Sequence, residues 1–436
     1  MSLEAWKQEF ENKKIIIWGF AREGKATWKL IRRLCPDLRL AVAEGRKKDL
    51  DDIRRMDELL DVFYDDEVDF NAYDMIMKSP GIVVRDGIDT SKVTEETDLF
   101  LKHYGDRTIG ITGTKGKSTT TSLTYTLLKE GLDVCLVGNI GIPCFEAVDD
   151  MENGATACFE LSCHQLEYAK HSPHIAVFLN LYEEHLDHYG TFENYALAKA
   201  NILKYQKEGD IAIVHPSLVK YVRDDVKRVY RIGEDINSDG NVLHLPGHSL
   251  EVKECRLIGA HNYQNLAVAY GIAKIMGLSD EKALRGMAAF CPLPHRLEDL
   301  GEFHGIRYVN DSISTIGQSC AQAIRTLPDV DTVLVGGMDR GIDYASFEEY
   351  LAHDTDVNVI FMYAAGHRIH AEMKEKGFVR DGLYEVEDLA QAIRLARTMT
   401  REHHICLLSP AASSYDHFKN FEERGDRFRE LAMEAE

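Results

Sequence analysis

A glycine-rich run between an apolar segment and a helix pattern constrains this chain most. The run Gly113 to Thr120 follows the short apolar segment 108–111 and opens an expected helix over 118–130. A strand, a glycine-rich turn and a helix N-terminus make an anion site, because small residues let backbone N–H groups face a phosphate. Lys117 can neutralise the β- and γ-phosphates, and the Ser118 hydroxyl can complete a magnesium shell. The run therefore predicts a site for a nucleoside triphosphate. The loop residues expected there are Gly113, Thr114, Lys115, Gly116, Lys117, Ser118 and Thr119.

The spacing of this run departs from the common phosphate-loop pattern. G-x-x-x-x-G-K-[ST] would need a glycine where the chain has Ile111. The alternative interpretation is a lysine-rich surface turn at the start of a helix.

Short apolar strands alternate with helix patterns along the whole chain. They are expected at 14–19, 38–44 and 75–77, at 134–137, 157–160, 175–179 and 211–214, and at 307–309, 332–335, 359–362 and 405–408. Such alternation is typical of parallel, Rossmann-like α/β sheets. A length of 436 residues suggests two or three domains, and the prolines of Cys291-Pro292-Leu293-Pro294 indicate a linker. We expect domains over 1–104, 105–293 and 294–436.

The turn after the first strand is not a G-x-G-x-x-G motif, so the chain gives poor support to a dinucleotide redox site. Glu44 ends the second strand, twenty-five residues after Gly19. It fits either contact with a nucleotide or a purely structural turn.

Several polar residues stand where apolar strands end, which is where open α/β sheets bind ligands. Glu160 fits a magnesium ligand or a helix-capping acid, and His185 with its acidic neighbours fits a second metal site or a solvated turn. Lys199, taken alone, is expected to be a surface lysine.

Further polar residues follow in the last two segments. Asn262 and Asn265, at i,i+3 on one helix face, can read an adenine edge or serve as caps. Arg296 is suited to bidentate contact with phosphate, and Asp311 can accept a hydrogen bond from a ribose hydroxyl.

The charge balance excludes some classes of partner. The chain has 72 acidic and 51 basic residues, a net charge of −21, which argues against sequence-independent binding of nucleic acid or of an anionic membrane.

Its nine cysteines form no C-x-x-C motif and are expected to be reduced thiols. No apolar stretch approaches the roughly 18 residues of a membrane span, and the N-terminus lacks a signal-peptide core. We expect a soluble, cytoplasmic protein.

Taken together and in this order, the motifs resemble the Mur ligase family over essentially the whole chain. The residues that carry the resemblance are Gly113–Ser118, Gly138–Gly141, Glu160–Ser162, Glu184–Asp187, Gly259–Asn262, His295–Arg296, Asn310–Ser312 and the run 408–425. The last run is similar to the members that add glutamate to UDP-N-acetylmuramoyl-L-alanine. The resemblance implies a UDP-substrate domain, a P-loop ATP-binding central domain and a Rossmann-like amino-acid-binding domain.

The resemblance also implies a role for each matching residue. Lys117 and Ser118 would hold ATP and a first Mg²⁺ with Glu160; His185 would hold a second Mg²⁺ with a carbamate formed from CO₂ on Lys199. The nucleotide would further contact Asn262, Asn265, Arg296 and Asp311. The UDP substrate would lie at Gly19, Arg22, Gly24, Glu44, Arg46, Ser79, Asn139 and His185, and glutamate at Thr315, Arg340, Ser414 and Phe421.

The implied activity is ATP-dependent amide-bond formation through an acyl phosphate, in cytoplasmic peptidoglycan precursor synthesis, by a monomeric enzyme. One departure concerns the acceptor. The D-glutamate-adding members carry lysine where this chain has Ile313, so L-glutamate remains an alternative acceptor. Two further alternatives are a folylpolyglutamate-synthase-like ligase and a nucleotide-binding protein without catalysis; the long α/β segment before the phosphate loop argues against the first.

Overall fold

The computed structural model describes residues 3–434, except 47, 49 and 258. Contacts divide the chain into two compact units. Unit 1 comprises Met1–Cys255 and His261–Phe290, and unit 2 comprises Arg256–Ala260 and Cys291–Glu436. The finer division at 104/105, and the boundary at 293/294, stay predictions.

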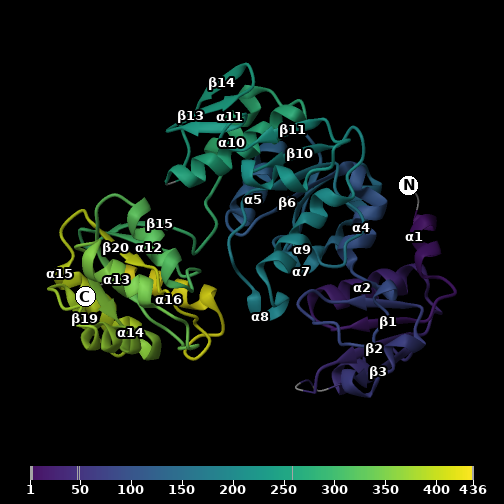
Figure 1. Cartoon of the computed structure of the whole chain (residues 1–436), viewed down its shortest axis with the longest axis horizontal. Helices are drawn as coiled ribbons and strands as arrows, with labels where there is room; N and C mark the ends of the chain where they lie inside the picture. The colour runs from purple at the N-terminus through teal and green to yellow at the C-terminus, as the bar shows by residue number, and fades with distance from the viewer. Residues whose placement is uncertain (1–2, 47, 49, 258, 435–436) are drawn as a thin grey trace. The chain divides into compact units, whose positions relative to one another are not determined.

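The N-terminal part of unit 1 is built on a parallel sheet (Figure 1). Its described strands lie in the order β3-β2-β1-β4-β5. All four residues of β1 are buried, as expected for a parallel strand covered on both faces. The strands are β1 (Ile15–Trp18), β2 (Leu40–Glu44), β3 (Leu60–Tyr64), β4 (Met75–Lys78) and β5 (Val93–Thr94), and the α-helices are α1 (Leu3–Phe10), α2 (Arg22–Leu34), α3 (Asp51–Arg54) and α4 (Glu96–Tyr104).

A second parallel sheet carries the phosphate loop. The described strands have the order β11-β10-β9-β6-β8-β7, so β6, which leads into the loop, is central. The strands are β6 (Thr108–Thr112), β7 (Val134–Gly138), β8 (Thr156–Glu160), β9 (Ile175–Phe178), β10 (Ile211–Val214) and β11 (Arg228–Arg231). The helices of this part are α5 (Lys117–Leu128), α6 (Val148–Glu152), α7 (Cys163–Leu166), α8 (Leu186–Tyr189), α9 (Phe192–Lys204), α10 (Ala260–Ile275) and α11 (Asp280–Ala289).

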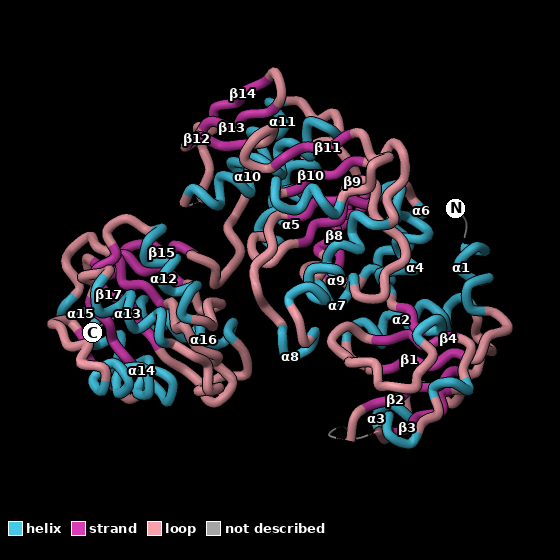
Figure 2. Tube along the Cα trace, viewed as in Figure 1, coloured by secondary structure: helices cyan, strands magenta, loops and turns pink. Residues whose placement is uncertain are grey.

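A small antiparallel sheet was not expected from the sequence. It consists of β12 (Asn237–Asp239), β13 (Val242–Leu245) and β14 (His248–Glu251), shown near α10 and α11 in Figure 2. Most of its residues are exposed or half-buried, so the strands carry little of the apolar alternation that reveals a strand.

One hydrophobic core joins the two parallel sheets of unit 1. It includes Val42 of the first sheet and Phe159 of the second. Helix α4 contributes to this core. The ring of its Phe100 packs edge-on against Phe159 of the second sheet at 5.5 Å, and the hydroxyl of its Tyr104 accepts a 2.7 Å hydrogen bond from the indole of Trp6 on α1. The two sheets are therefore parts of one packed body.

Unit 2 is a Rossmann-like layer structure. Its described strands have the order β15-β16-β20-β17-β18-β19, in which only the β15–β16 pair is antiparallel among the pairings described. Val333 and Val335 of β17 pack into one core and Leu334 into another, so both faces of the sheet are covered. The strands are β15 (Glu298–Phe303), β16 (Ile306–Asn310), β17 (Val330–Val335), β18 (Asn358–Phe361), β19 (Leu383–Glu385) and β20 (Ile405–Leu408); the helices are α12 (Gly317–Thr326), α13 (Ala345–His353), α14 (Tyr363–Glu375), α15 (Leu389–Met399) and α16 (Phe421–Met433). The expected parallel α/β class is confirmed.

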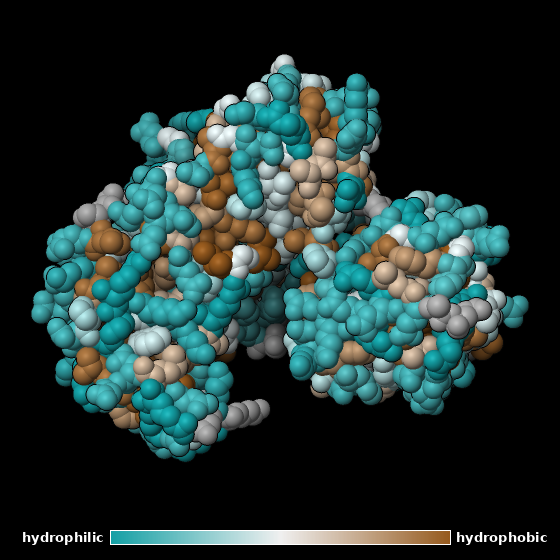
Figure 3. Space-filling model, turned by 180° about the vertical axis from the view of Figure 1, so that it is seen from behind, coloured by the Kyte–Doolittle hydropathy of each residue, from teal (hydrophilic) through white to brown (hydrophobic). Residues whose placement is uncertain are grey.

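One face of the molecule is mainly polar. Figure 3 shows one face on which hydrophilic residues predominate and hydrophobic residues occur in separate patches. Within the described part of the chain, no helix combines the length and the apolar character needed to cross a bilayer.

Candidate active site

The phosphate loop joins the central strand β6 to the N-terminus of α5. Gly116, directly before α5, has a φ of 83°, and a Cβ there would lie 2.8 Å from the side-chain oxygen of Asn265. Only glycine accommodates this conformation and this close approach without strain. The side-chain oxygen of Asn180 accepts hydrogen bonds from the backbone N–H groups of Thr114 (3.1 Å) and Lys115 (2.8 Å). Asn180, which follows β9, therefore fixes the loop from the neighbouring strand.

Side chains of the loop point in different directions. The Lys117 ammonium donates a 3.0 Å hydrogen bond to the carbonyl of Thr114, so it folds back over the loop. Lys115 forms an ion pair with Glu184, whereas the Thr114 hydroxyl is buried against the Tyr195 hydroxyl at 3.1 Å. Gly113 and Thr119, also expected at the nucleotide, belong to the same loop and to the first turn of α5.

Glu160 provides the test of whether this site fits Mg²⁺. Its side chain is fully buried at the end of β8, and its Oε1 accepts hydrogen bonds from the Ser118 hydroxyl (3.2 Å) and the Asn139 amide (3.0 Å). Its Oε2 is enclosed and has no hydrogen-bond partner among the described residues. A buried carboxylate oxygen without a partner is rare, and hard cations prefer oxygen ligands. The residues at this position fit a magnesium ion.

Lys199 is buried, so the expectation of a surface lysine is wrong. It lies on α9 with 1% of its surface exposed, and its Nζ donates a 2.8 Å hydrogen bond to the carbonyl of Gly113. Burial, and secondarily the charge of Lys117, lowers the pKa of Lys199 to about 7. The amine is thus largely neutral in mildly alkaline solution.

A cavity of about 380 Å³ in unit 1 brings together four of the residues singled out from the sequence. They are Lys117, Asn139, His185 and Lys199. His185 has a φ of 57°, an uncommon left-handed conformation for a residue other than glycine. The other lining residues are Glu23, Pro80, Gly81, Ser162, Cys163, His164, Gln165, Glu184 and Tyr195.

Three residues expected at the UDP group meet at the carboxyl edge of the first sheet. The Glu44 carboxylate accepts a 2.6 Å hydrogen bond from the backbone N–H of Phe20, and the Ser79 hydroxyl donates to the carbonyl of Gly19 at 2.9 Å. Glu44 therefore stabilises the turn after Gly19. Its contact with a nucleotide stays a prediction.

The other UDP candidates lie around this turn. Arg22 begins α2 and donates to the carbonyl of Gly141, and the close packing of Gly24 against Gly19 leaves no room for a Cβ. The Arg46 guanidinium is paired with Asp66 and Glu67, each at 2.8 Å.

Asn262 and Asn265 lie side by side on α10, as their spacing predicts. The amide of Asn265 donates to the side-chain oxygen of Asn262 at 3.4 Å. Since Asn265 also borders Gly116, both asparagines lie close to the phosphate loop.

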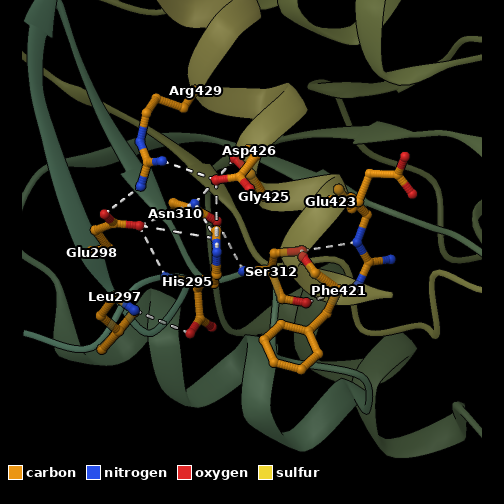
Figure 4. A network of polar contacts seen from close by, with 12 residues as sticks. His295, Leu297, Glu298, Asn310, Ser312, Phe421, Glu423, Gly425, Asp426 and Arg429 are labelled. Atoms are coloured by element: carbon orange, nitrogen blue, oxygen red, sulfur yellow. Dashed lines mark hydrogen bonds and ion pairs between the residues drawn. The ribbon is translucent and has the colours of Figure 1, made fainter. Parts of the chain in front are cut away.

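Unit 2 holds the remaining nucleotide candidates, Arg296 and Asp311. Their chain neighbours His295 and Asn310 belong to the polar network shown in Figure 4. His295 and Asn310 are joined at 2.9 Å, and the backbone N–H of His295 donates to Glu298 at 2.9 Å. Arg296 follows His295 in this turn. Asp311 is buried and accepts hydrogen bonds from the hydroxyls of Ser314 and Ser409; burial raises its pKa to about 6.

The four residues expected at glutamate also lie in unit 2. Thr315 is half-buried in the turn after β16, Arg340 is exposed, and Ser414 is buried. The loop before Arg340 is joined to the segment before Ser414 by a bridge between Met338 and Ser413. The carbonyl of Phe421 accepts a 2.8 Å hydrogen bond from the Ser312 hydroxyl, which ties α16 to the same turn.

Comparisons with known proteins find relatives that match nearly the whole chain. Residues 111–273 match the model of the Mur ligase middle domain. The chain is 33% identical over 435 residues to the UDP-N-acetylmuramoylalanine–D-glutamate ligase of Aquifex aeolicus, covering 96% of this chain and 98% of that protein. The chain belongs to the Mur ligase family. It is also 31% identical over 456 residues to the protein of the same name from Pelotomaculum thermopropionicum, covering 98% of each.

Solved Mur ligases share the fold. The UDP-N-acetylmuramate-alanine ligase MurC of Thermotoga maritima aligns with a TM-score of 0.57 at 17% identity, covering 96% of this chain and 99% of that one. The MurF ligase of Thermotoga maritima, solved in complex with ADP, aligns with a TM-score of 0.57 at 18% identity, covering 91% and 95%. The multi-domain α/β architecture of a Mur ligase, expected from the sequence, is thereby confirmed.

Two buried polar contacts of this Mur ligase were missed by sequence reasoning. The amide of Gln165 donates a 2.9 Å hydrogen bond to Glu23, whose pKa is raised by burial. Lys78 and Glu95 form an almost fully buried ion pair at 2.9 Å, and burial raises the pKa of Glu95 to about 8. The S-x-x-Q capping pattern of Ser162 and Gln165 could have indicated the position of Gln165. The Lys78–Glu95 pair has no local signal, because β4 and β5 bring the two residues together.

Proposed function

We propose that this chain joins D-glutamate to UDP-N-acetylmuramoyl-L-alanine and converts ATP to ADP and phosphate in the process. The observation that carries the proposal is the full-length relationship: relatives with 33% and 31% identity over nearly both chains bear the name of this reaction. The reaction belongs to peptidoglycan precursor synthesis, and we assign the enzyme to the cytoplasm as a monomer. The −21 net charge supports small anionic substrates held by local cations rather than nucleic acid or a membrane as partners.

The phosphate loop binds ATP in this proposal. Backbone N–H groups at the start of α5 face the phosphates, and Lys117 offsets the charge that repels the attacking carboxylate. Ser118 and Glu160 hold a first Mg²⁺; the unpartnered Oε2 of Glu160 supports this assignment. Bound Mg²⁺ supplies electrostatic stabilisation of the transferring phosphoryl group. Asn262 and Asn265 contact the adenine, Asp311 the ribose and Arg296 the γ-phosphate.

Lys199 acts as a carbamate in this proposal. Its nitrogen attacks the carbon of CO₂ and loses a proton, so a cation becomes an acidic ligand. The buried, largely neutral amine supports this reaction because only the unprotonated nitrogen is a nucleophile. The carbamate and His185 hold a second Mg²⁺.

The reaction proceeds in two steps. The substrate carboxylate attacks the γ-phosphorus of ATP and forms an acyl phosphate while ADP leaves. The free amine of glutamate then attacks the acyl carbon, and phosphate leaves. Asn139 and His185 position the UDP substrate together with Gly19, Arg22, Gly24, Glu44, Arg46 and Ser79. Thr315, Arg340, Ser414 and Phe421 bind glutamate.

The test is product analysis with D- and L-glutamate in competition, combined with ADP release. The proposal expects continuous ADP release over many turnovers only when UDP-N-acetylmuramoyl-L-alanine and glutamate are both present, with the D-glutamyl product in excess. An excess of the L-glutamyl product would show that the enzyme prefers L-glutamate. Ile313 would then be the first residue to substitute. ADP release with a folate and no UDP substrate, or no ADP release at all, would contradict the proposal.

A further inference from the structure

Three potential metal ligands converge beside the cavity of unit 1. His164 lies on α7, Glu167 directly follows that helix, and His188 lies on α8. One ligand atom from each of the three lies within 4.8 Å of the other two. The Nε2 atom of His188 is 3.1 Å from a carboxylate oxygen of Glu167, and the rings of His164 and His188 lie 4.4 Å apart.

The chemistry of this set differs from that of the magnesium position. Two imidazoles and one carboxylate are a common protein set for Zn²⁺, whereas Mg²⁺ prefers oxygen ligands and water. Bonds of about 2.0–2.2 Å in a tetrahedral shell place neighbouring ligand atoms roughly 3.3–3.6 Å apart. The contact between His188 and Glu167 is already near this spacing. The ligand atom of His164 lies within 4.8 Å of the other two, so this side chain has to move closer when a metal binds.

The backbone that carries the three ligands is clamped to α9. The amide of Asn201 donates hydrogen bonds to the carbonyls of Leu166 (2.9 Å) and Glu167 (3.3 Å), at the end of α7. The amide of Asn194 donates to the carbonyl of Tyr189 (3.0 Å), at the end of α8. Both short helices contact α9, and α7 is also closed by the Ser162–Gln165 capping box.

A further contact orients one of the rings. The Tyr189 hydroxyl lies 3.3 Å from Nδ1 of His164. In metal sites of proteins, a hydrogen bond to the ring nitrogen that does not bind the metal fixes the orientation of the histidine. The cluster is therefore organised by its surroundings and is not a chance meeting of exposed side chains.

We propose that His164, Glu167 and His188 bind a transition-metal dication, with Zn²⁺ as the reference ion, at a site that adjoins the second Mg²⁺ position at His185 but has its own ligands. The site leaves a fourth position for water. Because His164 also lines the cavity, the bound cation joins α7 to α8 and fixes one wall of the substrate pocket.

The test measures Zn²⁺ binding to the full-length protein by equilibrium dialysis in excess Mg²⁺. The variants are His188→Ala and Glu167→Gln, and the control is His174→Ala. His174 forms a similar 2.8 Å pair with Asp210, but the pair is not part of a three-ligand group among the described residues. Wild type and His174→Ala are each expected to bind one Zn²⁺ at least about 10-fold more tightly than His188→Ala and Glu167→Gln. Removing a residue that only hydrogen-bonds to a metal ligand already costs about that much affinity, so removing a ligand should cost at least as much.

A thermal melt provides the second measurement. At the same Zn²⁺ concentration, the ion is expected to raise the melting temperature of wild type more than that of Glu167→Gln, which preserves side-chain shape. Equal Zn²⁺ affinity in wild type, His188→Ala and Glu167→Gln would overturn the proposal. So would loss of binding in Cys163→Ser with retention in His188→Ala, because Cys163, His164 and His185 form a neighbouring group with similar spacing.

Discussion

The Nζ atom of Lys199 lies 2.8 Å from the carbonyl oxygen of Gly113, so a lysine of α9 reaches the first residue of the phosphate loop. The side chain is buried, and its ammonium lies 5.0 Å from the centre of the Tyr195 ring. Placing an amine here costs desolvation, which lowers its pKa to about 7. The geometry connects the nucleotide site directly to the residue proposed to carry a carbamate.

Replacing Lys199 tests the carbamate. Lys199→Ala should nearly abolish turnover, and short-chain carboxylic acids should partly restore it because they replace the lost ligand oxygens. ADP release measures both effects. Lys204→Ala, an exposed position on the same helix, is the control and should leave turnover unchanged. Near-normal activity of Lys199→Ala would exclude the carbamate.

Lys117 should act in the chemical step as well as in binding. In the proposed mechanism it faces charge that moves during phosphoryl transfer, so Lys117→Ala should lower kcat by roughly 100-fold or more, the scale of losing one electrostatic stabiliser. Steady-state kinetics with varied ATP separates the two effects. The exposed Lys129, at the other end of α5, provides the control through Lys129→Ala. An effect confined to the KM for ATP would limit Lys117 to ground-state binding.

Glu160→Gln should change stability and activity in opposite directions. The substitution keeps the shape of the side chain but removes a buried charge, so the ligand-free protein should melt at a higher temperature. The Mg²⁺ concentration for half-maximal activity should rise at least about 10-fold, because a neutral amide is a weaker ligand. Thermal melts without Mg²⁺ and a Mg²⁺ titration of ADP release measure the two effects. A lower melting temperature together with an unchanged Mg²⁺ requirement would show that Glu160 is only a structural acid.

The phosphate loop could be predicted because its determinants are local. Glycines and a helix start within eight residues specify the turn, and Gly116 adopts the left-handed conformation that the turn needs. The burial of Lys199 could not be predicted, because it arises from the packing of α9 against β6 and β9. The antiparallel strands β12 to β14 were missed since they are short and half-exposed, and the buried Lys78–Glu95 pair since it depends on strand pairing.

Arg340 should contribute to glutamate recognition. The residue is exposed in the loop after β17, where its guanidinium can reach a carboxylate. Arg340→Ala should raise the KM for glutamate roughly 10- to 150-fold, the range for one charge-assisted hydrogen bond, and leave the KM for ATP little changed. Arg394→Ala, at an exposed position on α15, is the control. Equal changes in both KM values would indicate a general disturbance of unit 2.

Ile313 tests the choice of acceptor. Its backbone N–H donates to the carbonyl of His295 at 3.2 Å, so the turn holds the position in place while the side chain is half-buried. Ile313→Lys should shift preference toward D-glutamate if the wild type accepts both forms. Competition between D- and L-glutamate measures this shift. Strict D-specificity in the wild type, unchanged by Ile313→Lys, would show that residue 313 does not face the amino acid.

Arg424 should hold in position the two segments that carry the proposed glutamate-binding residues. Its buried guanidinium donates to the hydroxyl (3.0 Å) and carbonyl (2.8 Å) of Ser312 and to the carbonyl of Ala412 (3.0 Å), which ties the turn after β16 to the segment before Ser414. Arg424→Lys keeps the charge but loses the planar guanidinium with its several N–H donors. Buried carbonyl oxygens then lack a donor, and each costs about 1–3 kcal/mol of folding free energy. Urea unfolding should show a loss of roughly 2–4 kcal/mol.

The kinetic signature of Arg424→Lys distinguishes positioning from stability alone. The KM for glutamate should rise while the KM for ATP stays nearly unchanged at a temperature where the variant is folded, because the displaced segments carry Thr315 and Ser414 and leave the phosphate loop of unit 1 untouched. Arg427→Lys is the matched control, since Arg427 lies on the same helix α16 but is exposed and paired with Glu430. A stability loss without any change in the KM for glutamate would reduce Arg424 to a structural residue, and no loss of either kind would contradict the hydrogen-bond argument itself.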